Sequence, residues 1–262
     1  MARLGGGRIL SEIVLLSNKL ANTLVERGQP LTQAQTATKF ISLGKVPEMQ
    51  DLIALVSKLT ANDLRLSLPD EEAWKAGDYS QVGHHPAPCI YTGIYEPESA
   101  LLSMSLFSLR DGDSRLPLHD HPGMHGIIKV VRGRIRIFRY SWLDPVVERQ
   151  LVVPASLSSL RKKIGVLRPA KYEGCSLLSP EDNACLLEPM NGNVHSIEAV
   201  DGSATFFDLL LPSYSPPGRD CHYYEVAQDE EEQSAKNITW LRRTGIPSTY
   251  YCDSLPFKDA LI

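Results

Sequence analysis

The chain has 262 residues, a formal net charge of −4 and a sequence pI of about 6.0. This length allows one large domain or two small ones, and a hydrophobic content of 43% is enough to bury a sizeable core. The weakly acidic balance lacks the basic footprint of nucleic-acid-binding proteins, and no apolar run approaches the ~20 residues that a transmembrane helix needs, so we expect neither nucleic acid nor a membrane as a partner.

The N-terminus and the cysteines predict a cytoplasmic protein. The segment MARLGGGRIL lacks the apolar stretch and cleavage site of a secretory signal, and Glu12 and Glu26 argue against a mitochondrial presequence. The five cysteines are an odd number, are widely spaced and include no C-x-x-C pair. This usage indicates a reducing compartment rather than a disulfide framework.

Amphipathic helices are predicted near the N-terminus. Apolar residues recur at helical spacing over residues 9–27 and again over residues 47–59, where Pro47 suits a first helical turn. A further helix is predicted at residues 32–42. Their apolar faces indicate packing against a core rather than binding of a partner helix.

The pattern changes after Asp63 to alternation with a period of two, starting at Leu64, Leu66 and Leu68. A loop rich in Pro, Gly, Asp and His follows, and short apolar runs between turn signals then continue to about residue 226. These runs predict strands at Cys89–Glu96, Ala100–Leu109, Gly126–Val131, Arg134–Trp142, Ala184–Glu188, His195–Val200 and Ala204–Leu211.

Many short strands with little helix between them are typical of a sandwich or barrel. We therefore predict a mainly β protein, with an N-terminal helical segment at residues 1–62 and a β domain at residues 63–262. We expect a monomer, because a barrel closes on itself.

Three histidines fall within the segment PLHDHPGMHG, residues 117–126. Alternate residues of a strand point to the same face, so His119 and His121 should project together. Two imidazoles on one face can chelate a divalent transition metal. The Pro-Gly pair that follows bends the chain, so we expect His125 to be a neighbour of the site rather than a ligand.

A metal needs at least a third protein ligand, for which His195 is the best candidate because it begins an alternating run after a turn. His222 is the competing candidate, and His84 and His85 lie in the loop rich in Pro and Gly. A lone histidine is usually an ordinary polar residue. An H-x-H pair in an all-β chain, with another histidine further along, instead matches the metal-binding pattern of small β-barrels.

These histidines and the nearby glycines resemble the two-part motif of the cupin superfamily, whose fold is a double-stranded β-helix, or jelly-roll barrel. The first motif usually carries a glutamate where this chain has His125. The resemblance therefore implies a site of three histidines without a carboxylate, which is typical of thiol dioxygenases. The matching residues are Gly112, His119, His121 and Gly133 in the first part, and Gly192 and His195 in the second.

A narrower resemblance covers about residues 46–262. The segments PLHDHPGMHG, FFDLLLPSY (206–214) and GRDCHYY (218–224) are similar to the cysteamine (2-aminoethanethiol) dioxygenase family and, more distantly, to the plant cysteine oxidases. The resemblance implies an Fe(2+) enzyme that adds both atoms of O₂ to a thiol and yields a sulfinic acid. Three neutral imidazoles would leave the iron its full double charge, which attracts a thiolate.

The implied substrates are a small aminothiol, cysteamine, which becomes hypotaurine, and an exposed N-terminal cysteine of a protein or peptide. Oxidation of such a cysteine can mark a protein for degradation through the N-degron pathway. Because O₂ is a substrate, the resemblance also implies a role in oxygen sensing and the response to hypoxia.

Asp208 is the one acid in the apolar run FFDLLL, and an unpaired buried carboxylate is costly. It either pairs with a structural arginine or lysine or, as the resemblance implies, binds the substrate ammonium or orders the pocket together with Tyr214. A cysteamine-like substrate has an amine and no carboxylate, whereas an oxidase of free cysteine would want an arginine.

Cys221 and Tyr223 complete the predicted catalytic set. They are two residues apart and can share one face of a strand. Some thiol dioxygenases carry a thioether between a cysteine and a tyrosine near the iron, so we expect either this cross-link or simple barrel packing.

Two rival functions remain open from the sequence. A different metal-dependent cupin enzyme, such as a zinc sugar isomerase or a dioxygenase acting on carbon, would need a further ligand or base near the site, typically a glutamate. A non-catalytic cupin binding module would keep the barrel but need not keep all three histidines.

Overall fold

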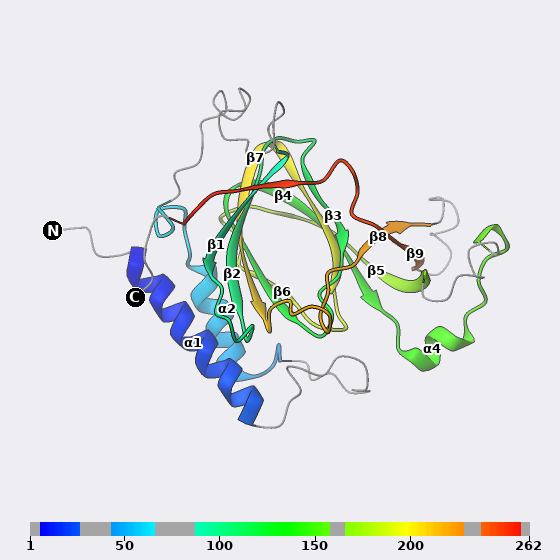
Figure 1. The fold of residues 1–262 in the computed structure, drawn as a ribbon, viewed down its shortest axis with the longest axis horizontal. Coiled ribbons are helices and arrows are strands. Elements are labelled where there is room, and N and C mark those ends of the chain that lie inside the picture. Colours follow the sequence, from blue (N-terminus) through cyan, green and yellow to red (C-terminus); the bar gives the residue numbers. More distant parts are fainter. Residues whose placement is uncertain (1–5, 27–42, 66–86, 158–165, 228–236, 258–262) are drawn as a thin grey trace.

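The structure, a computed structural model, describes residues 6–26, 43–65, 87–157, 166–227 and 237–257. It is a β-barrel with helices α1 and α2 packed against one side (Figure 1). In chain order the elements are α1 (Gly6–Glu26), α2 (Pro47–Ser57), β1 (Cys89–Tyr95), β2 (Ser103–Leu109), β3 (Arg115–His119), β4 (His125–Trp142), α4 (Pro145–Gln150), a 3₁₀ helix η1 (Ala155–Leu157), β5 (Leu167–Leu178), β6 (Cys185–Leu187), β7 (Val194–Leu211), β8 (Tyr223–Val226), β9 (Ile238–Thr244) and β10 (Cys252–Ser254).

The barrel closes through two long strands. β4 and β7 are antiparallel neighbours from the pair His125–Leu211 to the pair Tyr140–Val194. From β7 the ring continues through β3, β8, β9 and β5, and β5 returns to β4. β2, β1 and β10 extend the sheet from the other half of β7. The expected mainly β barrel, preceded by α-helices, is confirmed.

β4 and β7 correct the sequence prediction, which divided each of them into two strands. Gly133 has a φ of +68°, and the pairing of β4 with β7 shifts register there. A β-carbon at this position would collide with the carbonyl oxygen of Ser203. In β7, Asp201 and Gly202 have φ values of +57° and +125°. Residues in this conformation form bulges that bend a strand without ending it, so the apparent turns are bends.

Alternation along the strands separates the two faces of the sheet. On β7, Phe207 and Leu209 point outward and join a buried cluster with α1 and α2, to which the helices contribute Leu10, Ile13, Met49 and Leu52. The intervening residues, Phe206, Asp208 and Leu210, point into the barrel and line a cavity. The period of two thus determines that Asp208 lies inside.

The helices predicted at residues 9–27 and 47–59 are confirmed within a few residues as α1 and α2. The predicted helix at residues 32–42 and most of the alternating run from Leu64 lie outside the described residues. Strands β5, β8, β9 and β10 were not predicted. Part of the reason is that β5 contains proline, lysine and glycine and is mostly half-buried, so it lacks clear alternation. None of the helices in the described ranges is long and apolar enough to cross a bilayer.

Candidate metal centre and adjoining cavity

Three histidines converge inside the barrel. His119 ends β3, His121 follows two residues later, and His195 is the second residue of β7, where it is the cross-strand partner of His119. The ring centroids are 4.9 Å apart for His119 and His121, and 4.5 Å apart for His119 and His195. One possible ligand atom of each ring lies within 4.8 Å of the other two. The structure therefore brings the three predicted ligands together around one point.

In His119 and His195, a hydrogen bond at Nδ1 leaves the other ring nitrogen, Nε2, free to bind a metal. Nδ1 of His119 lies 2.8 Å from the carbonyl oxygen of Pro117, and Nδ1 of His195 lies 3.4 Å from the carbonyl oxygen of Asn193. A carbonyl oxygen only accepts hydrogen bonds, so Nδ1 carries the proton in both rings. Nε2 then keeps its lone pair, as a metal-binding imidazole requires.

Tyr214 orients the third ring in the same way. Its hydroxyl donates to the carbonyl oxygen of Asp120 at 2.7 Å, and the phenolic oxygen lies 2.9 Å from Nδ1 of His121. Because the hydroxyl proton points at the carbonyl group, Nδ1 of His121 is the donor to the phenolic oxygen. Removing outer contacts of this type typically costs about 10- to 100-fold in metal affinity.

Burial keeps the three imidazoles uncharged. It lowers the pKa of His119 and holds the pKa values of His121 and His195 well below the usual range, with the neighbouring His119 as a further cause for both. The neutral form is the one that binds a metal. Three buried nitrogen donors fit a divalent transition metal, and no carboxylate or thiolate of the described residues joins this cluster.

Two residues that the sequence analysis missed hold the histidine segment in place. The carboxylate of Asp120 accepts hydrogen bonds from the Tyr224 hydroxyl and from the backbone N–H of His222, both at 2.9 Å. The side chain of Asn193 donates to the carbonyl oxygen of His121 at 2.7 Å and accepts from its N–H at 3.0 Å. Their positions, within two residues of a predicted ligand, were the only signal in the sequence.

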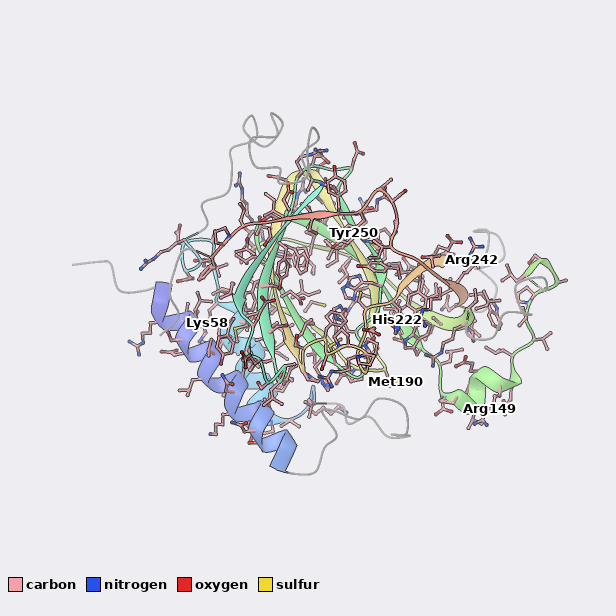
Figure 2. All side chains as sticks on the ribbon, viewed as in Figure 1. Lys58, Arg149, Met190, His222, Arg242 and Tyr250 are labelled. Atoms are coloured by element: carbon pink, nitrogen blue, oxygen red, sulfur yellow. The ribbon has the colours of Figure 1, made fainter. Side chains whose placement is uncertain are left out.

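The remaining histidines do not join the cluster. His222, labelled in Figure 2, faces Asp120, with Nδ1 3.2 Å from a carboxylate oxygen. His125 begins β4 opposite Leu211 and does not line the cavity, which agrees with its predicted place as a neighbour. His84 and His85 lie outside the described residues.

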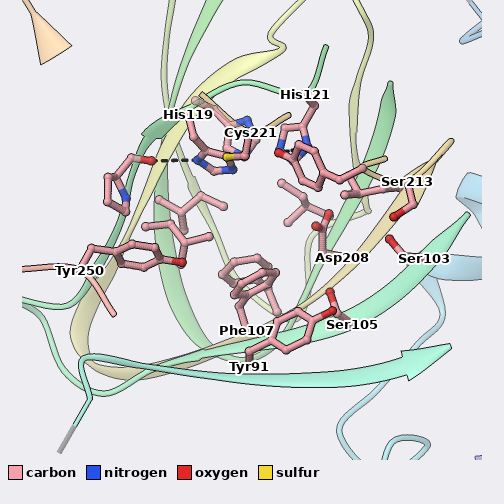
Figure 3. Close-up of a pocket in the computed structure, with 18 of the residues that line it drawn as sticks. Tyr91, Ser103, Ser105, Phe107, His119, His121, Asp208, Ser213, Cys221 and Tyr250 are labelled. Carbon is pink, nitrogen blue, oxygen red and sulfur yellow. Dashed lines mark hydrogen bonds between the residues drawn. The ribbon is translucent and has the colours of Figure 1, made fainter. Parts of the chain in front are cut away.

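A cavity of about 410 Å³ opens beside the three histidines (Figure 3). This volume is within the range of small-molecule sites. Two carboxyl groups line it, those of Asp208 and Glu96, and no lysine or arginine of the described residues does. The cavity is therefore suited to a small ligand that carries a positive charge.

Asp208 is buried in this cavity, with 7% of its surface exposed, opposite Ser105 of β2. The structure shows no arginine or lysine of the described residues paired with it, so the structural ion pair considered from the sequence is not found. Burial raises its pKa to about 7. The carboxyl group is therefore poised between its two protonation states near neutral pH, and a nearby ammonium group would favour the charged form.

Cys221, Tyr214 and Tyr223 form a polar cluster in the cavity wall. Burial raises the pKa of the Cys221 thiol, and hydrogen bonds with both tyrosines oppose this effect. Tyr223 is also the cross-strand partner of His119 on β3. All the predicted catalytic residues, including Asp208, thus lie in one cavity with the three histidines.

Among the described residues, the three-histidine cluster has no further ligand of the kind that a different cupin enzyme would use. Glu96 lines the cavity, but it is hydrogen-bonded to the Tyr91 hydroxyl and does not belong to the cluster of possible metal ligands. It therefore does not supply the further ligand that a different cupin enzyme would need. A non-catalytic module need not keep three converging histidines, and this chain keeps them.

Known proteins are similar to most of this chain. The PCO_ADO family model matches residues 55–261. The 2-aminoethanethiol dioxygenase of Homo sapiens is 32% identical over 228 residues, which cover 80% of this chain and 79% of that protein. The enzyme of the same name from Mus musculus is 36% identical over 185 residues, covering 65% and 70%. Plant cysteine oxidase 1 of Arabidopsis thaliana is 32% identical over 142 residues, covering 48% and 43%.

Proposed function

The chain belongs to the PCO_ADO family, and on that premise we propose that it is an Fe(2+)-dependent thiol dioxygenase. It converts cysteamine to hypotaurine, and the N-terminal cysteine of proteins and peptides to cysteine sulfinic acid, with O₂ as co-substrate. One observation carries the proposal: three buried, uncharged imidazoles converge beside a cavity lined by carboxyl groups and by no cation of the described residues.

His119, His121 and His195 would hold the iron, since a nitrogen of each ring is free to bind a metal. Bound Fe(2+) would supply positions for thiol and O₂ and, because its protein ligands are neutral, a full double charge that favours a thiolate. The chain keeps these nitrogens unprotonated by burial and oriented by two backbone carbonyl groups and Tyr214. The apolar residues of the cavity, such as Phe206, exclude water from the reacting sulfur.

Asp208 binds the amine of the substrate. Its carboxyl group lines the same cavity as the three histidines, so an aminothiol can place its sulfur at the metal and its ammonium group at Asp208. An ion pair there offsets the cost of burying the carboxylate. Free cysteine is a poorer substrate, because its carboxylate would meet no arginine or lysine among the described lining residues. An N-terminal cysteine in a peptide has the amine but no free α-carboxylate.

Cys221 and Tyr223 form a thioether during turnover: the S–H bond of Cys221 and a ring C–H bond of Tyr223 break, a C–S bond forms, and O₂, the co-substrate, takes up the two electrons and two protons. Support comes from the hydrogen bond between their side chains and from the place of Tyr223 beside His119. The cross-link would stiffen the start of β8, where Tyr223 pairs with His119 of β3. Tyr214 acts beside them by orienting His121.

In the cell, the enzyme works in the cytoplasm as a monomer on small aminothiols and on cysteine-initiated proteins. Oxidation of such proteins feeds the N-degron pathway and so reports oxygen supply. We assign residues 63–262 to the cupin thiol dioxygenase domain and residues 1–62 to an N-terminal helical segment, of which the described helices α1 and α2 pack against one side of the barrel.

The proposal is tested by oxygen uptake after loading with Fe(2+), using cysteamine, free cysteine and a cysteine-initiated peptide. Cysteamine and the peptide should each gain two oxygen atoms from labelled O₂, and free cysteine should react more slowly. His195→Ala should abolish uptake and iron retention, whereas the control His222→Gln, outside the cluster, should retain iron. A failure of the iron-loaded protein to consume O₂ with any of these thiols would rule the proposal out.

A further inference from the structure

Two cysteines outside the metal centre face each other across neighbouring strands. Cys89 begins β1, Cys252 begins β10, and the two are direct partners in a parallel pairing. In the same pairing, Ile90 is the partner of Asp253 and Tyr91 is the partner of Ser254. β10, in the red segment that crosses the barrel in Figure 1, is only three residues long.

The geometry of this pair suits a disulfide bond. Direct partners on adjacent strands are separated by about 4.8 Å and project their side chains to the same face. A disulfide needs a Cα–Cα separation of about 4.4 to 6.8 Å, so neither strand has to move. The two side chains already make a hydrogen bond with each other.

The two thiols differ in the way that thiol–disulfide exchange requires. Cys89 is fully buried, and burial raises its pKa. Cys252 is partly exposed, and the hydrogen bond from Cys89 lowers its pKa. Cys252 is therefore the nucleophile that an external oxidant can reach, and Cys89 is the resolving thiol.

We propose that Cys89 and Cys252 are a redox-active pair that closes to a reversible disulfide in exchange with a small-molecule disulfide, such as oxidised glutathione. The Cys252 thiolate attacks one sulfur of the oxidant, forms a mixed disulfide and releases one glutathione thiolate. Cys89 then loses its proton and attacks Sγ of Cys252, which releases the second glutathione. In sum, two protein thiols are oxidised by two electrons and one glutathione disulfide is reduced to two thiols.

The disulfide would connect the redox state to the wall of the cavity. Tyr250, labelled in Figures 2 and 3, lines the cavity two residues before Cys252, and its hydroxyl lies 3.3 Å from the Cys252 sulfur. Its ring lies 6.2 Å from that of Tyr223. Oxidation removes the thiol proton that Cys252 donates to Tyr250 and joins β10 covalently to β1. The C-terminal segment that carries Tyr250 is thereby held against the barrel.

The test needs no measurement of activity, so it does not depend on the proposed function. The full chain is equilibrated in buffers of increasing ratio of oxidised to reduced glutathione, quenched, denatured and alkylated with iodoacetamide. We expect the number of alkylated thiols to fall by two and the unalkylated mass to fall by two hydrogen atoms. Peptide mapping should then join the peptide that contains Cys89 to the one that contains Cys252.

Dithiothreitol separates this bond from the thioether proposed at Cys221, which also removes two hydrogen atoms. The reductant should restore both thiols of the pair, whereas a thioether resists it. Cys89→Ser should trap glutathione on Cys252, and the matched control Cys175→Ser, at an exposed cysteine of β5, should still lose two thiols. The proposal is overturned if the wild-type chain keeps glutathione on Cys252, or if both thiols stay alkylatable in excess oxidised glutathione.

Discussion

Replacing Asp208 by asparagine should stabilise the metal-free protein at alkaline pH and weaken its binding of amines. Burial raises the pKa of this carboxyl group from the usual 3.8 to about 7, and each pKa unit corresponds to about 1.4 kcal/mol. The charged form therefore costs the native state about 4 kcal/mol. Asparagine has nearly the same shape and carries no charge, so it avoids this cost.

The sign follows from the protons bound in each state. Between pH 4 and pH 7 the native state keeps the Asp208 proton that the unfolded chain has lost, so the free energy of unfolding of the wild type falls as pH rises. Above pH 7 this contribution levels off. The stability difference between Asp208→Asn and wild type should therefore grow with pH, by roughly 2 to 3 kcal/mol between pH 5 and pH 8.

Equilibrium unfolding in urea across this pH range measures the difference. Ser105→Ala is the matched control, because Ser105 is the cross-strand partner of Asp208, lines the same cavity and does not titrate. The pH dependence of its free energy of unfolding should match that of the wild type.

In the iron-loaded enzyme, Asp208→Asn should raise KM for cysteamine roughly 10- to 100-fold, the usual value of a hydrogen bond to a charged group. If the free energies of unfolding of wild type and Asp208→Asn changed in parallel with pH, the raised pKa of Asp208 would be refuted. An unchanged KM for cysteamine would refute the binding of the amine by Asp208.

Four further substitutions test other parts of the structure. His195→Ala should reduce bound iron below a tenth of the wild-type amount, measured by elemental analysis, because two imidazoles do not complete the site. Tyr214→Phe removes the partner of a histidine ring and should weaken iron binding about 10- to 100-fold in a metal titration; unchanged affinity would show that the hydroxyl does not orient the ligand. Peptide mass spectrometry should find a loss of two hydrogen atoms in active wild type and none in Cys221→Ala, and a wild type with no such loss would disprove the cross-link. Gly133→Ala should lower the free energy of unfolding by at least about 1 kcal/mol, because its φ is +68° and the new β-carbon meets backbone, whereas Gly112→Ala, which meets nothing within 4 Å, should change it much less.

Much of this protein could be predicted from local patterns. Helical spacing located α1 and α2, and alternation located β1, β2 and most of β7, because these periods follow from the geometry of a single element. The H-x-H spacing placed His119 and His121 on one side of the chain for the same reason. The motifs around them indicated the family that the comparisons then supported.

Other features depend on partners that are distant in sequence. Whether a glycine ends a strand or bends it depends on the strand beside it, which is why β4 was divided at Gly133. β10 has only three residues and exists through its pairing with β1. Asp120 and Asn193 are unremarkable as single letters, and their roles appear only when their hydrogen-bond partners are in place.

The sequence by itself determined the type of fold, the candidate ligands and the acid in an apolar strand, since each of these is a property of neighbouring residues. Only the tertiary structure decided that His195 meets the other two imidazoles, that Asp208 faces them without a cation of the described residues, and that Cys89 lies beside Cys252. The physical reason is barrel closure, which brings together strands far apart in the chain and sets at once their register, their burial and the charges that their side chains meet.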